Sequence, residues 1–296
     1  MKQISSILEE MYFGRFFFIV AKVLRESLFV NSILQNSEVW YNMTEDNINQ
    51  LEKLDNILLR KIFEIGQSVP TAFLHLELRT LPFRFIIKTR RILYLQYLLK
   101  EKENSLLFRF LNAQMEDPKT GDWWPLVKKD LEEIKLNLSL HDIKSMSSDE
   151  LKDVVKKSVK DAAFKWLSDK KAKSKKVKDI HHGWLETEKY ISNPILTINQ
   201  SKLLFSLRSR MIFVRENYPN MQRENSCPFC STEENPVSDS QEHLLECEYL
   251  KSTDSELCHL DGKYDDIFSE NQLKQANMTI LLESKYNARK KILENL

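Results

Sequence analysis

Residues 44–65 read TEDNINQLEKLDNILLRKIFEI, and this stretch carries the pattern that decides the fold class. Its apolar residues recur at intervals of three or four positions: Ile48, Leu51, Leu54, Leu58, Ile62 and Ile65. Such spacing places them on one face of an α-helix. Thr44 is a suitable N-cap, and the carboxylates of Glu45 and Asp46 suit the first turn. We expect Gly66 to end the helix.

The rest of the chain shows similar signals on both sides of this stretch. Capping-box patterns, in which Ser or Thr precedes Glu or Gln by three residues, predict helix starts at Ser147, Thr197 and Ser269. The expected helices cover 15–35, 44–65, 70–78, 83–101, 121–135, 147–170, 198–214 and 269–294. Glycine, which tight turns favour, occurs only five times in 296 residues. The sequence therefore predicts a mainly α fold.

Composition and charge fit an ordinary globular protein of one large or two modest domains. Hydrophobic residues make up 42% of the chain, and the formal net charge is +1. The most apolar run, residues 16–24, contains Lys22 and is flanked by Arg15 and Arg25, so it is too short and too charged to span a membrane. No small-residue cleavage site follows it. We therefore expect no signal peptide and an intracellular location, in the nucleus or the cytoplasm.

Three of the four cysteines lie close together near the C-terminus. Cys227-Pro-Phe-Cys230 is followed, after twelve residues, by His243-Leu-Leu-Glu-Cys247. The first pair suits a tight loop, and the i, i+4 spacing of the second pair puts both side chains on one face of a helix. Three thiolates and one imidazole make a closed tetrahedral set, which is typical of structural zinc. We therefore predict one structural zinc ion in a small stapled segment ahead of a closing helix.

Two alternatives remain open for these residues. The cysteines could form two unrelated pairs beside a surface histidine. Cys258 and His259 could also compete as ligands, because Cys258 lies only eleven residues beyond Cys247, although the first four ligands already close the site.

A strongly basic stretch lies in the middle of the chain. Residues 152–178 contain eleven lysines and three aspartates, a net charge of +8. Such a strip can neutralise phosphates without reading base sequence, so we expect RNA or DNA as a partner. The candidate contacts are Lys156, Lys160, Lys171, Lys173, Lys175 and Lys176. The alternatives are a solvated helix face and a nuclear-localisation patch.

Several short segments occur in an order that resembles one protein family. They are Ser37-Glu-Val-Trp-Tyr41, Leu51-Glu-Lys-Leu-Asp55, Leu59-Arg-Lys61, Leu76-Glu-Leu78 with Leu81-Pro82, Arg90-Arg91, Gly121-Asp-Trp123, Leu207-Arg-Ser-Arg-Met211 and the cysteine–histidine set. In this order they resemble the region after the polymerase palm in reverse transcriptases of non-LTR (LINE-type) retrotransposons. The resemblance extends from about residue 14 to the end. That family usually has glycine after Leu-Glu-Leu; this chain has Arg79, so the turn there is expected to differ.

The resemblance implies a C-terminal fragment of such an enzyme, with the endonuclease and the catalytic palm encoded before residue 1. It implies a thumb-like helical region (1–120), a helical connector with the basic strip (121–220) and a zinc-binding segment with a closing helix (221–296). The expected partners are RNA or DNA and the missing portions of the same element, with no membrane. Full-length relatives would be RNA-directed DNA polymerases with an endonuclease, whereas this chain alone is expected to be no enzyme.

The resemblance also points to arginines and a lysine outside the strip. The candidates are Arg84, Lys88, Arg91, Arg208 and Arg210. The first three share one helix face, which in a thumb would hold the template–primer duplex. The last two lie near the zinc segment and are candidate RNA contacts. The alternative for all five is pairing with acids, namely Glu77 or Glu101 for the first three.

The residues also bear on other classes of function. The main alternative is a helical protein–protein adaptor with a zinc staple, as a domesticated remnant. A metal hydrolase would need an open zinc position and a placed general base, and the sequence shows neither. Tyr264-Asp265-Asp266 lacks the intervening residue and the flanking strands of the polymerase Tyr-x-Asp-Asp box. His181 and His182 lack neighbouring ligands and are expected at the surface.

Overall fold

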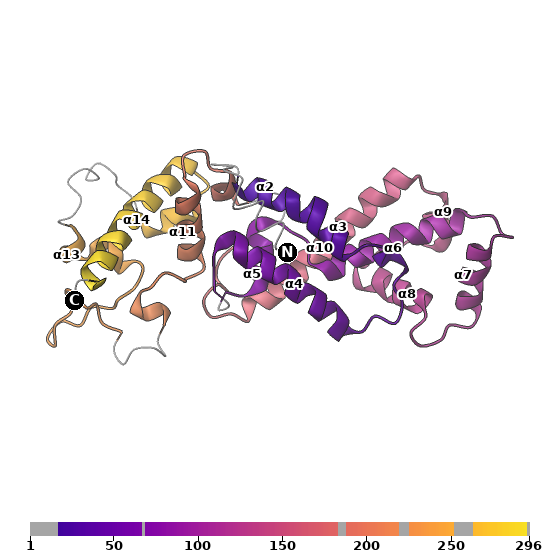
Figure 1. Cartoon of the computed structure of the whole chain (residues 1–296), viewed down its shortest axis with the longest axis horizontal. Coiled ribbons are helices and arrows are strands. Elements are labelled where there is room, and N and C mark those ends of the chain that lie inside the picture. The colour runs from indigo at the N-terminus through magenta and orange to yellow at the C-terminus, as the bar shows by residue number, and fades with distance from the viewer. Residues whose placement is uncertain (1–16, 67–68, 183–187, 219–224, 252–262, 295–296) are drawn as a thin grey trace.

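The computed structural model describes residues 17–66, 69–182, 188–218, 225–251 and 263–294. Helices dominate these ranges, which contain no β-strand and only one isolated antiparallel bridge, between Ser226 and Ser238. The predicted mainly α fold, with a Cys-Cys-His-Cys segment and a closing helix, is confirmed. The molecule is elongated, with the C-terminal helices at one end and α7 at the other (Figure 1). None of the helices in these ranges combines the length and the apolar character needed to cross a bilayer.

The first described helix contains one turn of π-helix. It runs as α2 (Phe17–Leu24), the π-helical turn η2 (Arg25–Phe29) and α3 (Val30–Ile33). Arg25 is only 1% exposed, and its Nε donates to the Asp55 carboxylate at 2.7 Å. A π-turn accommodates an extra residue within a helix, and such turns often mark positions with a special side-chain contact. Here the contact is a charged pair inside the apolar core.

The helix quoted from the sequence, α4 (Glu45–Phe63), has well-defined ends. The Thr44 side chain accepts from the backbone N–H of Asn47, and the Asn47 side chain accepts from that of Thr44, so the predicted N-cap is confirmed as a capping box. The prediction for the C-terminal end is wrong. Glu64, not Gly66, adopts the left-handed conformation (φ 55°), and the next N–H bonds back five residues to close the last turn.

A tight turn at Arg79 joins α5 (Thr71–Leu78) to α6 (Phe83–Lys100). The Arg79 backbone is left-handed, with φ 52° and ψ 49°. Glycine adopts this conformation readily, whereas other residues pay about 1–2 kcal/mol for it. Arg79 therefore occupies a backbone position that would suit a glycine.

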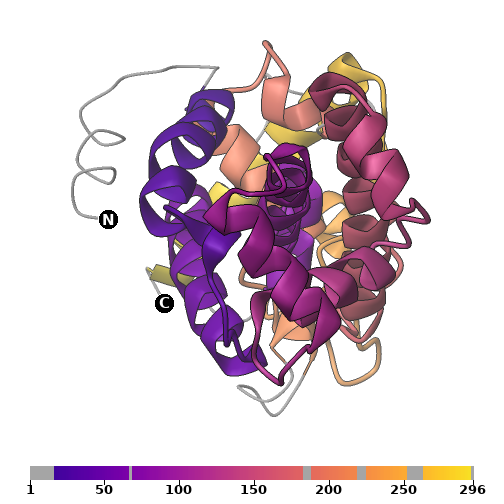
Figure 2. The ribbon, with the colours of Figure 1, turned by 90° about the vertical axis from the view of Figure 1, so that its right-hand side faces the viewer.

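Four more helices complete the body of the molecule. They are α7 (Leu106–Glu116), α8 (Trp123–Glu133), α9 (Leu140–Ser145) and α10 (Ser148–Ala172). The helices α8 and α10 confirm predictions, including the Ser147 capping box, whereas α7 and α9 were not predicted. Both begin at serine N-caps, Ser105 and Ser139. Helix α6 contacts α4, α7, α8, α9 and α10 and lies in the middle of the body (Figure 2).

The C-terminal part consists of two longer helices and several short ones. They are η4 (Lys189–Ser192), α11 (Ile198–Arg208), η5 (Arg215–Asn217), α12 (His243–Glu246), α13 (Glu248–Lys251), η6 (Tyr264–Phe268) and α14 (Gln272–Glu294). The Thr197 cap is confirmed, but α11 ends at Arg208 rather than near residue 214. The Ser269 cap is wrong: the Asn271 side chain accepts from the first N–H groups of α14, and the Ser269 hydroxyl instead accepts from the N–H of Asn271.

One apolar core connects the beginning of the chain to its end. Phe18, Phe63, Phe205 and Leu282 all belong to it, and the rings of Phe63 and Phe205 stack with their centroids 4.0 Å apart. A second core lies among α6, α8, α9 and α10. The C-terminal part therefore packs directly on the N-terminal helices. The division at residues 120 and 220 stays a prediction.

Candidate metal centre and nucleic-acid interface

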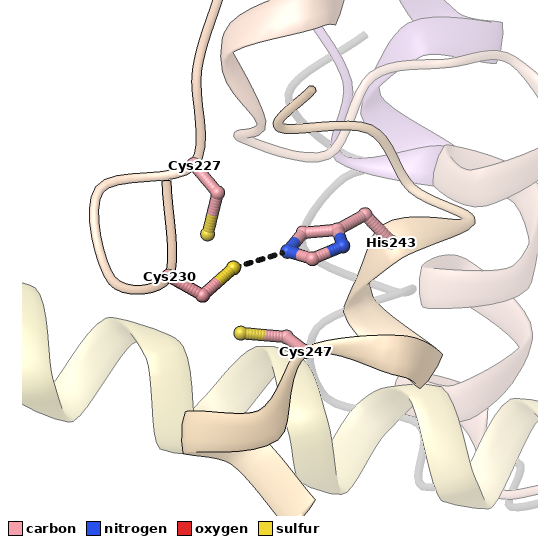
Figure 3. A group of neighbouring side chains, drawn as sticks. All are labelled: Cys227, Cys230, His243 and Cys247. Carbon is pink, nitrogen blue, oxygen red and sulfur yellow. Dashed lines mark hydrogen bonds between the residues drawn. The ribbon is translucent and has the colours of Figure 1, made fainter. Parts of the chain in front are cut away.

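The four predicted ligands converge on one point (Figure 3). Cys227 and Cys230 lie on one loop, His243 begins α12, and Cys247 follows that helix directly. Their ligand atoms all lie within 4.8 Å of one another, and Cys230 Sγ is 3.1 Å from His243 Nε2. The four side chains are therefore close enough to hold one metal ion.

Backbone hydrogen bonds position both pairs of ligands. The N–H of Cys227 donates to the Val237 carbonyl at 2.7 Å, next to the isolated bridge. The N–H of Ser231 turns back to the Cys227 carbonyl at 3.3 Å, which closes the tight loop. The N–H of Cys247 donates to the His243 carbonyl at 2.8 Å, so one helical turn sets the second pair.

The electrostatics of the cluster suit a cation. Burial and the neighbouring thiols raise the pKa of Cys230 and of Cys247, and burial lowers the pKa of His243. Three thiolates therefore repel one another unless positive charge lies between them, and a metal ion supplies that charge. The neutral imidazole is already in the form that ligates. Three sulfurs and one nitrogen fill a tetrahedral set, so the donors fit a structural ion. The alternative ligands Cys258 and His259 lie outside the described residues.

Polar contacts attach residues 225–251, which we call the metal segment, to α14 and α11. The buried Asp239 carboxylate accepts from the backbone N–H of Arg215 at 2.8 Å and from Arg289 Nη2 at 2.7 Å. The Gln241 amide, also buried, donates to the Leu207 carbonyl at 3.0 Å. The metal segment therefore depends on the surrounding helices for its position as well as on its own ligands.

Comparisons with known proteins identify no relative of this chain. No family model, no curated protein and no solved structure matches the chain.

The structure pairs the three candidate residues of the thumb-like face with carboxylates. Arg84 Nε donates to Glu52 at 2.8 Å. Lys88 and Arg91 both donate to Asp130, each at 3.1 Å. The three basic side chains are at most 10% exposed. These contacts favour charge compensation, with acids other than the two expected from the sequence.

Most candidate lysines of the strip are at the surface. Lys156, Lys160, Lys173 and Lys175 are exposed, and within the described ranges none of them forms an ion pair with a carboxylate. Lys171 differs. It is 7% exposed, and its Nζ donates to the Ile180 carbonyl, so this ammonium faces the interior.

The last candidate lysine of the strip and the two arginines near the metal segment have partners. Lys176 is half-buried, with its Nζ 4.8 Å from the centre of the Tyr218 ring. Arg210 is 37% exposed and donates to Glu242 at 3.0 Å. Arg208 is buried and donates to Glu77 at 3.0 Å through Nη2. Of the three, only Arg208 is withdrawn from solvent.

A buried charged network around Glu77 was missed by the sequence analysis. His182, expected at the surface, is 1% exposed at its side chain, and its Nε2 lies 2.9 Å from Glu77 Oε1. Burial alone would raise the pKa of Glu77, but the positive charge of Arg208 and the contact with His182 lower it to about 2. Arg208 also donates to Glu188 at 2.9 Å. The one signal in the sequence is a carboxylate inside the apolar run Leu76-Glu77-Leu78.

Proposed function

We propose that this chain is the nucleic-acid-binding C-terminal part of a non-LTR retrotransposon reverse transcriptase, without the catalytic palm. The observation that carries the proposal is the group of exposed lysines on α10 and just after it, which lie without carboxylate partners among the described residues. The ordered segments that resemble this family support the origin. The role follows from the charge: the strip neutralises phosphates, and it does so on RNA or DNA of any sequence.

We further propose that the metal ion is zinc. Three thiolates with one imidazole are a common structural zinc set, and four such ligands fill the tetrahedral positions of the ion. When bound, the ion supplies folding energy to the segment rather than chemistry. Cys227, Cys230, His243 and Cys247 would hold it, and the short helix α12 would keep the last two in register.

The phosphate contacts are assigned to four residues of the strip: Lys156, Lys160, Lys173 and Lys175. Lys156 and Lys160 are one helical turn apart on α10, so they present two charges along one line. The paired and buried cations Arg84, Lys88, Arg91, Lys171 and Arg208 are left out of this assignment, because carboxylates or carbonyl oxygens already take up their donors. Lys176 and Arg210 are also left out, because Lys176 lies half-buried against the Tyr218 ring and Arg210 donates to Glu242.

Salt-dependent RNA binding tests the assignment. Fluorescence anisotropy with a labelled single-stranded RNA, at three salt concentrations, gives the slope of log K against log salt. Each lysine that contacts a phosphate contributes roughly −0.7 to this slope. Replacing Lys156, Lys160, Lys173 and Lys175 by Gln should therefore flatten the slope by roughly 3 and weaken binding to all sequences alike.

A matched variant controls for net charge. Lys102, Lys119, Lys128 and Lys274 are also exposed and lie outside the strip. Their replacement by Gln changes the net charge equally and should leave most of the slope in place. The adaptor alternative predicts negligible RNA binding at physiological salt and no difference between the two variants, which would refute the assignment.

The retrotransposon origin has a separate test. The genomic DNA immediately upstream of codon 1 should encode, in frame, a polymerase palm with its paired catalytic carboxylates. An upstream region without a palm would refute this origin. It would leave the RNA-binding assignment to the anisotropy experiment.

A further inference from the structure

The end of the molecule opposite the metal cluster carries an apolar groove. It lies between the C-terminal half of α6, helix α7 and the start of α8, and it has a volume of about 320 Å³. The side chains that line it include Val39, Tyr94, Leu98, Leu107, Phe110 and Trp123. Its volume is at the lower end of the range for ligand pockets, which suits one or two bulky side chains better than a whole cofactor.

Large apolar side chains continue from this groove onto the surface. Leu106 is 81% exposed, Phe110 is 60% exposed, and Tyr41, on the other side of the groove, is 72% exposed. Only Leu111 of helix α7 is buried. A two-sided arrangement of exposed anchors around a hollow is typical of a protein–protein contact, because a small molecule in the hollow would leave the anchors in water.

Among the described residues that line the groove, one is charged, and it is a carboxylate. Asp122 lines it, and no lysine or arginine is among its described lining residues. Tyr94, which also lines it, has its pKa raised by burial and by the carboxylates of Glu38 and Glu101, so both acids lie within electrostatic reach. An apolar hollow with carboxylates at its margin complements a segment that carries apolar anchors and positive flanks.

We propose that this groove docks an amphipathic helix of a partner protein, with bulky apolar residues facing α7 and lysine or arginine on its flanks. Helix-in-groove recognition of this kind uses anchors spaced at i, i+3, i+4 and i+7. A membrane surface fits less well, because anionic lipids attract basic rather than acidic margins. The inference is independent of the proposed function, since the groove and the lysine strip share no residue.

Two synthetic peptides test the proposal directly. Both are fluorescein-labelled 18-residue helices with leucine and phenylalanine on one face; one carries lysine on the other face, and its twin carries glutamate. Anisotropy at physiological salt should show clearly tighter binding of the lysine peptide. Phe110→Asp should weaken that binding at least about tenfold, because it removes a central anchor. Glu38→Gln with Asp122→Asn should weaken it roughly two- to fivefold, as expected for charges at a margin.

The control variant is Leu273→Asp, which changes an equally exposed apolar residue on α14, 57% exposed and far along the chain. It should leave binding unchanged. Equal binding of both peptides, absence of binding, or an equal loss with Leu273→Asp would refute the proposal. Self-association in sedimentation that Phe110→Asp abolishes would assign the groove to a second copy instead. Binding to phosphatidylserine vesicles that the same change abolishes would assign it to lipid.

Discussion

The body of the molecule and its metal segment keep their shapes by different means. In the body, the long helices α4 and α10 bury apolar faces against α6. The metal segment, residues 225–251, has only the four-residue helices α12 and α13 and one isolated bridge. Helices this short do not persist without outside support. Burial of apolar area accounts for the body, whereas for the metal segment we propose that a bound metal ion adds a cross-link to its contacts with the core.

The largest predicted difference between the two regions should appear when the proposed metal ion is removed. Cys227→Ser or His243→Ala should abolish stoichiometric zinc binding and unfold the metal segment, since structural zinc in small peptides contributes about 10–16 kcal/mol of apparent binding energy. Metal content by mass spectrometry and hydrogen exchange measured peptide by peptide give both readouts. The amides of α12 should lose protection.

The helices of the body provide the control in the same experiment. Amides of α4, α6 and α10 should stay protected in both variants, because their apolar partners lie elsewhere. General loss of protection would show that the ion supports the whole molecule. If the metal-free segment remained protected, the proposal that a metal ion stabilises it would be wrong.

The next largest effect concerns the network that joins the body to α11. Arg208→Ala leaves the Glu77 carboxylate buried without its main partner, and loss of one partner of a buried pair typically costs 3–5 kcal/mol, so about that much destabilisation is expected. Arg210→Ala is the matched control. That ion pair is more than a third exposed, so its removal should cost roughly 0–1 kcal/mol. Urea unfolding measures both, and equal costs would contradict the assigned importance of the network.

Acid should destabilise the body through His75. Burial lowers the pKa of His75 from its usual 6.5 to about 4, although the Asp55 carboxylate opposes this change. Between these values the unfolded chain binds a proton that the folded chain does not, so stability falls as pH falls from about 6.5 to about 4. The total loss is about 3 kcal/mol, at 1.36 kcal/mol per pKa unit. Glu77, whose pKa is lowered to about 2, adds a further loss below about pH 4.5.

A variant isolates this contribution from the acid sensitivity of the metal ligands. His75→Gln cannot titrate, so the difference in unfolding free energy between pH 7 and pH 5 should be smaller than in the unchanged chain. Urea unfolding at the two pH values provides the comparison. An unchanged pH dependence would show that His75 is not the titrating group.

The smallest predicted effect tests the turn at Arg79. Arg79→Ala and Arg79→Gly both lose the ion pair with Glu188 and the hydrogen bond to the Leu76 carbonyl. Only the glycine variant also removes the steric strain of the left-handed backbone at this position. The glycine variant should therefore be more stable than the alanine variant by about 1 kcal/mol. Thermal unfolding of the pair measures this difference, and a more stable alanine variant would show that the backbone is not strained.

Helices and metal ligands were predictable because they depend on residues close together in the chain. The caps at Thr44, Ser147 and Thr197 and the spacing of the cysteine–histidine set are local features. Ser139 carried a comparable local signal for α9, with Asp142 three residues later, and the sequence analysis did not use it.

The buried charges were not predictable in the same way. Lys171 belongs to a run of lysines, yet it lies inside because the Ile180 carbonyl accepts from it. His182 is held by Glu77, which is 105 residues away in the chain. Periodicity shows which residues share a helix face, but it does not show what covers that face. The candidate metal site could therefore be predicted residue by residue, and the charged surfaces could not.

The distance along the chain between Glu77 and Arg208 also has a consequence for the newborn protein. The two residues are separated by 131 positions, so the ribosome makes the carboxylate long before it makes its guanidinium partner. At typical rates of translation, this interval lasts roughly 7–26 s. During that time the Glu77 side chain cannot take its final buried position, because burial of a carboxylate without a partner is energetically unfavourable. We therefore expect α5 to complete its packing around Glu77 only after most of the chain has been synthesised.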